Sequence, residues 1–230
     1  MGGGPVLSPI FLMNVQRIET YATPVWIATL DNLLPHKQIM IDETVRLRKE
    51  ADETIKQKSN RNGWHSDLRI LENPKFVPLK NTLQNLSRQI LVDYGANTED
   101  RVFSFAGWAN VHDKGGYNVS HVHPGSWISG SIYLKVPEGA GRLFFEDPRQ
   151  ATRMEHIPML QDRNKDPMRS RGKFYVTPKE MMVVMFPGWF EHGVEDCECD
   201  QRISVAFNIT PVQIRQGQLD QLRKLEKKSI

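Results

Sequence analysis

This sequence has few cysteines, no long apolar runs and a small net charge, and each of these features excludes a class of protein. The 230 residues include only 2 cysteines, too few for the disulfide framework that small secreted domains use in place of a large core. Cys197 and Cys199 are separated by one residue, a spacing unsuited to an ordinary structural disulfide. Their acid-rich surroundings predict an exposed turn and raised thiol pKa values. We therefore expect a reducing compartment.

Membrane and nucleic-acid partners are disfavoured for similar reasons. No apolar run approaches the roughly 18 residues that a membrane-spanning helix needs. The apolar patch near the N-terminus lacks the basic residues of a signal peptide. The 30 basic and 27 acidic residues leave a net charge of only +3, which gives no general attraction to nucleic acid or anionic lipid. We expect a cytoplasmic protein with neither kind of partner.

The length and the absence of internal repeats predict one large domain. Residues 1–19 include a glycine- and proline-rich stretch that cannot bury a core, so we expect a flexible lead there. The domain is predicted over residues 20–212. Residues 213–230 form a charged segment with a few leucines, and we expect a C-terminal helical tail.

The first part of the domain contains helical periodicity. Residues 34–58 and 78–94 place apolar side chains at helical spacing, and we expect both helices to pack on the outside of a barrel. Residues 20–30 are rich in aromatic and β-branched side chains and predict an edge strand. Residues 60–73 are rich in turn formers, so a loop near the barrel mouth is expected there.

From residue 101 the pattern changes to short strands separated by Gly, Pro and Asp turns. Such a series is typical of an antiparallel sheet that is closed or folded into a sandwich. The predicted strands are residues 101–111, 116–122, 126–136, 141–147, 173–178, 181–186 and 202–210. Residues 147–173 interrupt this pattern with an excess of basic side chains. A loop of this length is typical of a lid or a binding loop, so we expect a lid-like insertion.

Three histidines in this region predict a metal site. Side chains at i and i+2 of a strand point the same way, so His121 and His123 face one small volume. His192 follows an apolar strand and a Pro-Gly turn and can supply a third ligand. Neutral imidazole is a common metal ligand. If His123 does not bind, Asp113 or Glu146 could supply a carboxylate instead.

The order of these segments resembles that of the Fe(II) and 2-oxoglutarate-dependent dioxygenases, especially their prolyl-hydroxylase-like branch. The family's first ligand pair and tyrosine strand are matched by GGYNVSHVHP and SIYLKVPEGAGRLFF, and its distal His and Arg strand by FPGWFEHGV and RISVAFNI. The resemblance covers residues 21–211 and includes a group of uncharacterised oxygenases of bacteria and phages. It implies a mainly β, α+β fold, namely a cupin-like jelly roll, or double-stranded β-helix, with the helices outside.

The resemblance also implies cofactors and roles. Fe(II) would be bound by the three histidines, and 2-oxoglutarate would be the co-substrate, with its distal carboxylate on Arg202. Ser204, two residues further on the same strand face, and Tyr133 would add contacts. The reaction would consume O2, release succinate and carbon dioxide, and hydroxylate an unidentified small molecule or peptide. The candidates for an apolar substrate pocket are Trp64, Trp108, Trp127 and Trp189.

One position departs from the family pattern, because residue 123 is His where most relatives have Asp or Glu. The exchange keeps three ligands on one face of the metal but removes a negative charge. It leaves open a three-histidine site that acts without 2-oxoglutarate, as a cofactor-independent dioxygenase or a zinc-type hydrolase. A non-catalytic cupin-like binding protein also stays open, although neither a hydrolase nor such a binding protein would need Arg202.

Overall fold

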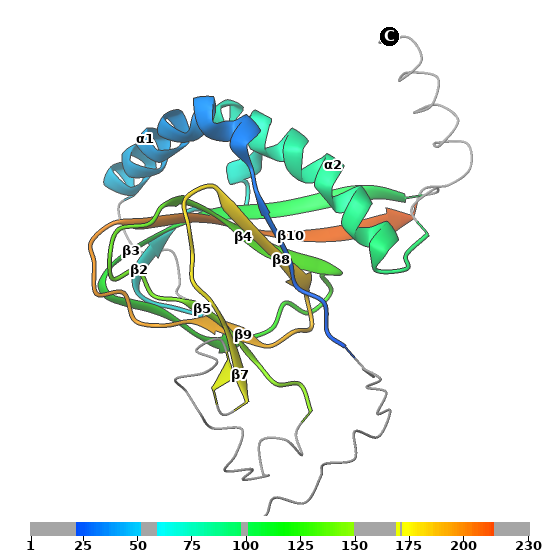
Figure 1. Cartoon of the computed structure of the whole chain (residues 1–230). Coiled ribbons are helices and arrows are strands. Elements are labelled where there is room, and N and C mark those ends of the chain that lie inside the picture. Colours follow the sequence, from blue (N-terminus) through cyan, green and yellow to red (C-terminus); the bar gives the residue numbers. More distant parts are fainter. Residues whose placement is uncertain (1–21, 52–58, 98–100, 150–168, 171, 214–230) are drawn as a thin grey trace, which may run out of the picture.

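The computed structural model describes residues 22–51, 59–97, 101–149, 169, 170 and 172–213 (Figure 1). The predicted lead at 1–19, most of the predicted insertion at 147–173 and nearly all of the predicted tail at 213–230 lie outside these residues.

Two helices and ten strands make up the described fold. The helices are α1 (Leu34–Glu50) and α2 (Val77–Asp93), with short 3-10 turns η1 (Asp31–Leu33), η2 (Ile70–Glu72) and η3 (Pro74–Phe76) beside them. The strands are β1 (Trp26–Thr29), β2 (Asn60–His65), β3 (Arg101–His121), β4 (Ile128–Lys135), β5 (Leu143–Glu146), β6 (Arg169–Ser170), β7 (Lys173–Val176), β8 (Met182–Pro187), β9 (His192–Val194) and β10 (Arg202–Gln213). A mainly β chain with two flanking helices is thus confirmed.

The strands form one hydrogen-bonded path in the order β1-β8-β4-β10-β3-β9-β5-β7-β6, with β2 paired to β3. Neighbours on this path are antiparallel, and apart from β6 and β7 they are far apart in sequence; β10, for example, lies between β3 and β4. Figure 1 shows the sheet curling over, with α1 and α2 across its upper face and β5, β7 and β9 on the other side.

The two sides of the curled sheet differ in chemistry. On the helix face, apolar residues of β10 such as Val205, Phe207 and Ile209 are fully buried in one core with Leu79 and Leu83 of α2. The inner face carries the alternate residues of the same strand, including Arg202, Ser204 and Asn208, because successive side chains point to opposite sides. A second, smaller apolar cluster around Phe145 and Phe186 fills part of this inner side.

Two sequence predictions about the strands were wrong. The predicted strands 101–111 and 116–122 are a single strand, β3. Gly115, with a φ of 78°, accommodates an irregularity in the middle of the strand, and the pairing with β2 continues on both sides of it. The predicted loop at residues 60–73 begins as strand β2. Asn62, with a φ of 50°, lies at the irregularity and lets β2 resume pairing on its other side.

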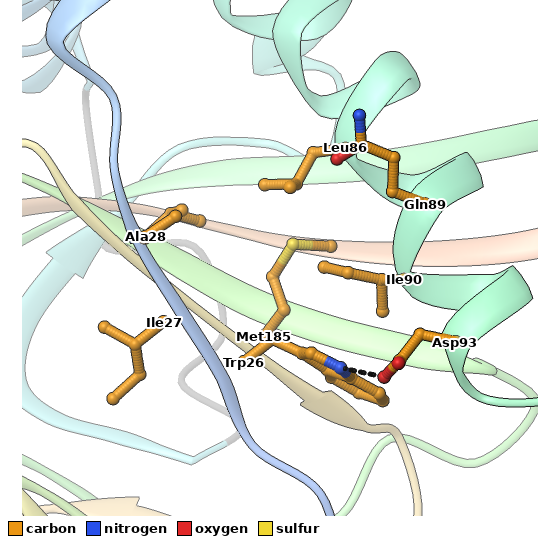
Figure 2. A pocket seen from close by; sticks show the side chains of 9 residues that line it. Trp26, Ile27, Ala28, Leu86, Gln89, Ile90, Asp93 and Met185 are labelled. Carbon is orange, nitrogen blue, oxygen red and sulfur yellow. Dashed lines mark hydrogen bonds between the residues drawn. The ribbon is translucent and has the colours of Figure 1, made fainter.

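A pocket of about 250 Å³ lies between β1, β8 and α2, with Trp26 hydrogen-bonded to Asp93 at one side (Figure 2). Its walls are mostly apolar, with Leu86, Ile90 and Met185 among the lining residues. It lies on the helix face, so it does not contain the histidines described next. Within the described ranges, no helix combines the length and apolar character of a membrane span.

Candidate metal centre

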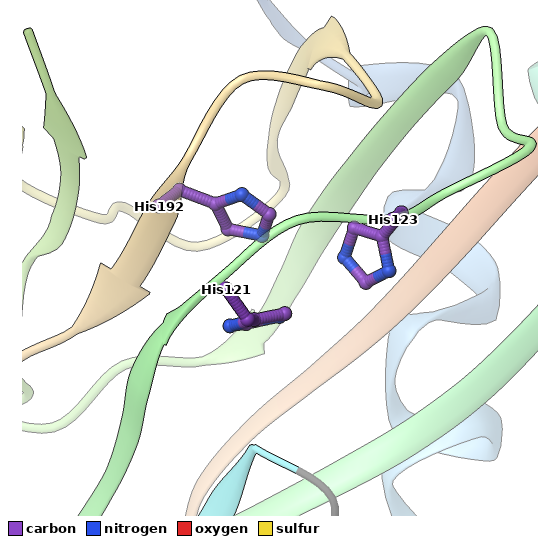
Figure 3. Close-up of side chains that lie close together, drawn as sticks. All are labelled: His121, His123 and His192. Atoms are coloured by element: carbon purple, nitrogen blue, oxygen red, sulfur yellow. The ribbon is translucent and has the colours of Figure 1, made fainter. Parts of the chain in front are cut away.

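The end of β3 and the start of β9 bring the three histidines together. His121 is the last residue of β3 and pairs directly with His192, the first residue of β9. His123 follows just past the end of β3, and in Figure 3 the three imidazoles gather around one space. Their rings lie 4.5 to 5.1 Å apart, and their ligand nitrogens all lie within 4.8 Å of one another. The group is therefore compact enough to surround one ion.

Backbone carbonyls orient two of these rings. The Nδ1 of His121 lies 2.7 Å from the carbonyl oxygen of Val119, and the Nδ1 of His192 lies 2.8 Å from that of Phe190. Because a carbonyl only accepts, each Nδ1 must carry the proton, which leaves Nε2 with a free lone pair. Hydrogen bonding of this kind is the usual outer support of metal-binding histidines. The donor set therefore fits a divalent metal.

Burial keeps these imidazoles neutral. His192 is 5% exposed, and burial, followed by repulsion from His121, lowers its pKa to about 3. Burial also lowers the pKa of His121 from its ordinary value. Neutral imidazole is the form that binds metal, so the site is ready for an ion at neutral pH.

His123 has different surroundings. Its Nδ1 lies 3.4 Å from the amide of Asn208, which is held by the hydroxyl of Ser129 at 2.8 Å. The ring of Trp108 lies 5.9 Å from the His123 ring. The intervening Val122 is 42% exposed, so it does not point into the core as the central residue of a regular strand would. The reason is that β3 ends at His121, and the strict alternation of a strand ends with it.

Aromatic packing and a glycine hold His192 in place. Its ring lies 4.4 Å from that of Phe186 and 6.2 Å from that of Phe145. A Cβ on Gly193 would lie 2.5 Å from the Phe144 ring and 2.8 Å from the Asn118 carbonyl oxygen. Only glycine allows β9 to approach β3 and β5 so closely, and this approach sets the position of His192.

Arg202 lies further along the inner face. Its side chain is 2% exposed, and its Nη1 donates to the Nδ1 of His112 at 3.2 Å. Its Nε is buried without a hydrogen-bond partner, and no carboxylate of the described residues forms an ion pair with it. A buried cation without an anion is costly in a protein interior, so this arrangement is typical of a binding site for an anion.

Tyr133 and Ser204 face the same space, because they are paired residues of β4 and β10. The Tyr133 ring lies 5.1 Å from the guanidinium of Arg202, and its hydroxyl is buried without a partner. Burial raises the pKa of Tyr133, so the hydroxyl stays protonated and can donate. Tyr133 also belongs to the aromatic cluster that packs on His192, which links this pocket to the histidines.

The other predicted candidates lie elsewhere. The carboxylate of Asp113 pairs with Arg48, and that of Glu146 pairs with Lys173 at 3.0 Å. Among the described residues, the group that could hold a metal ion contains the three histidines alone. Of the four tryptophans predicted to line a substrate pocket, Trp108 is the one beside the histidines: Trp64 joins the helix-face core, and Trp127 and Trp189 are 43% and 52% exposed.

The cysteines differ from the prediction of an exposed turn. Cys197 is buried, and its Sγ lies 3.1 Å from that of Cys199. The pKa of Cys199 is raised to about 11, chiefly because burial disfavours the thiolate, with the Cys197 contact second. The acidic neighbours in the sequence are therefore not the main cause.

Comparison with known proteins places this geometry in a family. Residues 106–208 match the family described as "Putative 2OG-Fe(II) oxygenase", and the matched range includes the three histidines, Tyr133, Arg202 and Ser204. The matched segment, which contains every residue of this site, is that of a 2-oxoglutarate and Fe(II)-dependent oxygenase. Its predicted cofactors, Fe(II) and 2-oxoglutarate, are those of this family. No curated protein matches the sequence significantly.

Solved structures of oxygenases share the fold. A prolyl-4-hydroxylase from Pseudomonas putida matches with a TM-score of 0.59 and 12% identity, over 82% of this chain and 92% of that one. HygX from Streptomyces hygroscopicus, solved with nickel, 2-oxoglutarate and hygromycin B, has a TM-score of 0.53 and 13% identity over 83% and 84% of the two chains. A Trichoplax adhaerens prolyl hydroxylase, bound to a peptide of hypoxia inducible factor, has a TM-score of 0.53 and 9% identity over 81% and 83%. These likenesses confirm the predicted double-stranded β-helix.

Some residues around the site were missed at the sequence level. Asn208 shares the parity of Arg202 and Ser204 on β10, so strand alternation could have placed it on the inner face. His112 precedes Asp113 in the sequence, but no local pattern marks it as a neighbour of Arg202. Nothing in the sequence indicates that Asn60, 52 residues earlier, would lie against His112.

Proposed function

We propose that this oxygenase binds Fe(II) through His121, His123 and His192, binds the distal carboxylate of 2-oxoglutarate at Arg202, and hydroxylates a small molecule or a peptide. The observation that carries the proposal is the buried Arg202 guanidinium, which has no anionic partner among the described residues. Arg202 lies on the same inner face of the sheet as Asn208, the residue that contacts His123.

A dicarboxylate fits this pocket chemically. A guanidinium presents a planar set of donors that matches a carboxylate, and Arg202 has an unpaired Nε–H to offer. The unpaired hydroxyl of Tyr133 and the hydroxyl of Ser204 can add two further donors. These groups would satisfy the buried polar atoms and neutralise the buried charge in one binding event.

When bound, Fe(II) and 2-oxoglutarate supply the activation of O2, with decarboxylation of the keto acid to succinate and carbon dioxide. The residues of the chain hold and orient these groups. His121 and His192 keep their protons on Nδ1 and so present Nε2 to the metal. Three neutral imidazoles leave the whole positive charge of the ion in place, which favours an anionic chelating ligand beside it.

Asn208 can give His123 the same orientation. Binding through Nε2 requires the proton on Nδ1, and an amide oxygen can accept it. The Asn208 side chain presents its oxygen to His123 when its amide is turned over, and the Ser129 hydroxyl can then accept from the amide nitrogen instead of donating to the oxygen. Both bonds are thereby retained.

Substrates of two kinds are plausible on this fold. HygX was solved with the small molecule hygromycin B, and the Trichoplax adhaerens enzyme with a peptide. In this chain, Trp108 lies beside His123 and offers an apolar surface near the metal position. A substrate with an apolar portion next to the hydroxylated carbon would fit this contact.

Succinate release tests the proposed function. Iron-loaded protein in air should convert 2-oxoglutarate slowly to succinate, and faster when the right member of a metabolite and peptide library is added. Arg202→Ala should reduce the rate of succinate release by more than about 30-fold, because truncating one partner of a buried charge pair typically costs about 2–5 kcal/mol of binding free energy. Arg142→Ala is the matched control, since Arg142 pairs with Glu195 near the surface.

Two results would overturn the proposal. One is calorimetry under argon that detects no binding of 2-oxoglutarate to the iron-loaded protein. The other is metal-dependent hydrolysis without any succinate, which would support the zinc hydrolase alternative.

A further inference from the structure

His112 is a buried titratable group that the proposed reaction does not use. It lies on the inner face of β3, directly opposite Arg202 of β10, and is 1% exposed. Its two ring nitrogens contact different partners. Nδ1 lies 3.2 Å from Nη1 of Arg202, and Nε2 lies 2.9 Å from Oδ1 of Asn60.

The chemistry of these partners fixes the protonation of the ring. A guanidinium has no lone pair and can only donate, so Nδ1 of His112 must be the acceptor. The amide oxygen of Asn60 can only accept, so Nε2 must carry the proton. Burial and the charge of Arg202 act in the same direction, lowering the pKa of His112 to about 3. The ring is therefore a neutral acceptor for Arg202.

The backbone of β2 is shaped around this contact. A Cβ on Gly63 would lie 2.6 Å from Asn60 Oδ1 and 2.6 Å from Cδ2 of His112. Any other residue at 63 would push Asn60 and the imidazole apart. Asn60 itself is 2% exposed, so its side chain lies in the interior and contacts protein rather than solvent. The close approach of β2 to β3 thus places the acceptor that fixes the His112 ring.

We propose that Asn60 and His112 are positioning residues that hold the Arg202 guanidinium for the carboxylate of 2-oxoglutarate; this rests on the proposed function of Arg202. A neutral acceptor suits this task. A carboxylate at position 112 would also orient Arg202, but it would neutralise the charge and compete with the ligand. Imidazole takes up one Nη1 hydrogen and leaves the positive charge and the unpaired Nε–H for the ligand.

Substitutions at 112 test the proposal through 2-oxoglutarate affinity, measured by calorimetry under argon on protein loaded with Fe(II). His112→Leu removes the acceptor and should weaken binding by about 10-fold or more, as expected for a hydrogen bond to a charged group. His112→Asp should weaken it further by pairing with Arg202. His112→Gln can donate to Asn60 and accept from Arg202, so it should stay within about threefold of the parent protein. His65→Leu, on the same strand as Asn60, is the matched control.

Two further measurements separate positioning from general damage. Iron stoichiometry and the unfolding midpoint should show that the His112 variants are folded and loaded. In an Arg202→Lys background, His112→Leu should reduce the affinity for 2-oxoglutarate by a smaller factor than it does in the parent protein. The effects of substitutions at residues that act through one another are not additive. Equal costs in both backgrounds would overturn the proposal, as would full 2-oxoglutarate affinity in His112→Leu.

A spectroscopic readout is independent of the co-substrate. Spectra of protein with ¹⁵N-labelled histidine distinguish the two ring nitrogens and should show His112 protonated on Nε2 alone. Asn60→Ala should change this signal and weaken 2-oxoglutarate binding by a smaller factor than His112→Leu. If the parent protein fails to bind 2-oxoglutarate, the proposed function is wrong, yet the Nε2–H signal would still establish the Asn60–His112–Arg202 chain. A proton on Nδ1 instead would disprove that chain directly.

Discussion

The helix face and the inner face of the sheet are built from the same strands, yet they bury different kinds of side chain. Along β10, Val205, Phe207 and Ile209 are buried against helices and leave no polar atom to satisfy. On the other side of that strand, Arg202 is equally buried but keeps an unpaired Nε and an uncompensated charge. One face therefore stabilises the fold, whereas the other holds polar groups that a ligand would complete.

Removing a metal ligand should have the largest effect and should be confined to the inner face. His192→Ala is expected to lower the affinity for Fe(II) by more than about 100-fold, because loss of even an outer-shell partner of a ligand costs about 10–100-fold. Metal analysis after anaerobic reconstitution measures this loss. His36→Ala on α1 serves as the control. Undiminished iron in His192→Ala would exclude the three-histidine centre.

The two helices and the histidine cluster could both be predicted from local patterns in the sequence. Strand alternation is local, so it indicated that Arg202 and Ser204 share a face. It also predicted that His121 and His123 lie together, and they do so although β3 ends at His121. The helical periods also predicted α1 and α2 to within a residue, apart from the end of α1. These properties depend on neighbours in the chain.

The remainder depends on register between distant segments. Whether Asn60 contacts His112 is decided by how β2 pairs with β3, and the turn formers in that stretch predicted a loop instead. The burial of Cys197 likewise arises because its backbone bonds to Gly116, on β3. No local pattern at these positions contains that information.

Truncating the helix face should damage stability without changing the site. Phe207→Ala is expected to lower the free energy of unfolding by about 3–5 kcal/mol, since it leaves a cavity in a packed core where the ring also touches Gly130. Urea unfolding gives this value if the slope is unchanged. The folded fraction should still bind iron at the parent stoichiometry. A loss of iron in that fraction would mean that the two faces are coupled.

Glu43 sharpens the comparison, because it is a buried charge on the helix side whose partners are all present. Its carboxylate, 3% exposed, accepts from Arg46, Lys75 and Asn73 at 2.7 to 2.9 Å. Glu43→Gln should cost about 1–3 kcal/mol at neutral pH.

The same residue predicts a pH dependence. Hydrogen bonds from Arg46 and then Lys75 hold the pKa of Glu43 well below its ordinary value of 4.5. A lowered folded-state pKa gives stability that is complete above the unfolded value and is lost as pH falls below it. The difference in unfolding free energy between the parent protein and Glu43→Gln should therefore shrink between pH 5 and pH 3. A difference that stays constant over this range would contradict the role of the carboxylate charge.

Arg202→Met should have the smallest effect on stability and so distinguishes the two kinds of burial most directly. Removing a buried, unpaired charge favours the folded state. Against this, His112 Nδ1 loses its donor, at a cost of about 1–3 kcal/mol. These effects oppose one another, so the net change in unfolding free energy of the metal-free protein should be about 1 kcal/mol or less. The parent iron-loaded protein should gain stability when 2-oxoglutarate is added, and the variant should gain none, because ligand stabilisation follows affinity for the folded state. A cost similar to that of Phe207→Ala would show that Arg202 belongs to the structural core, and the inner face would then lose its distinction from the helix face.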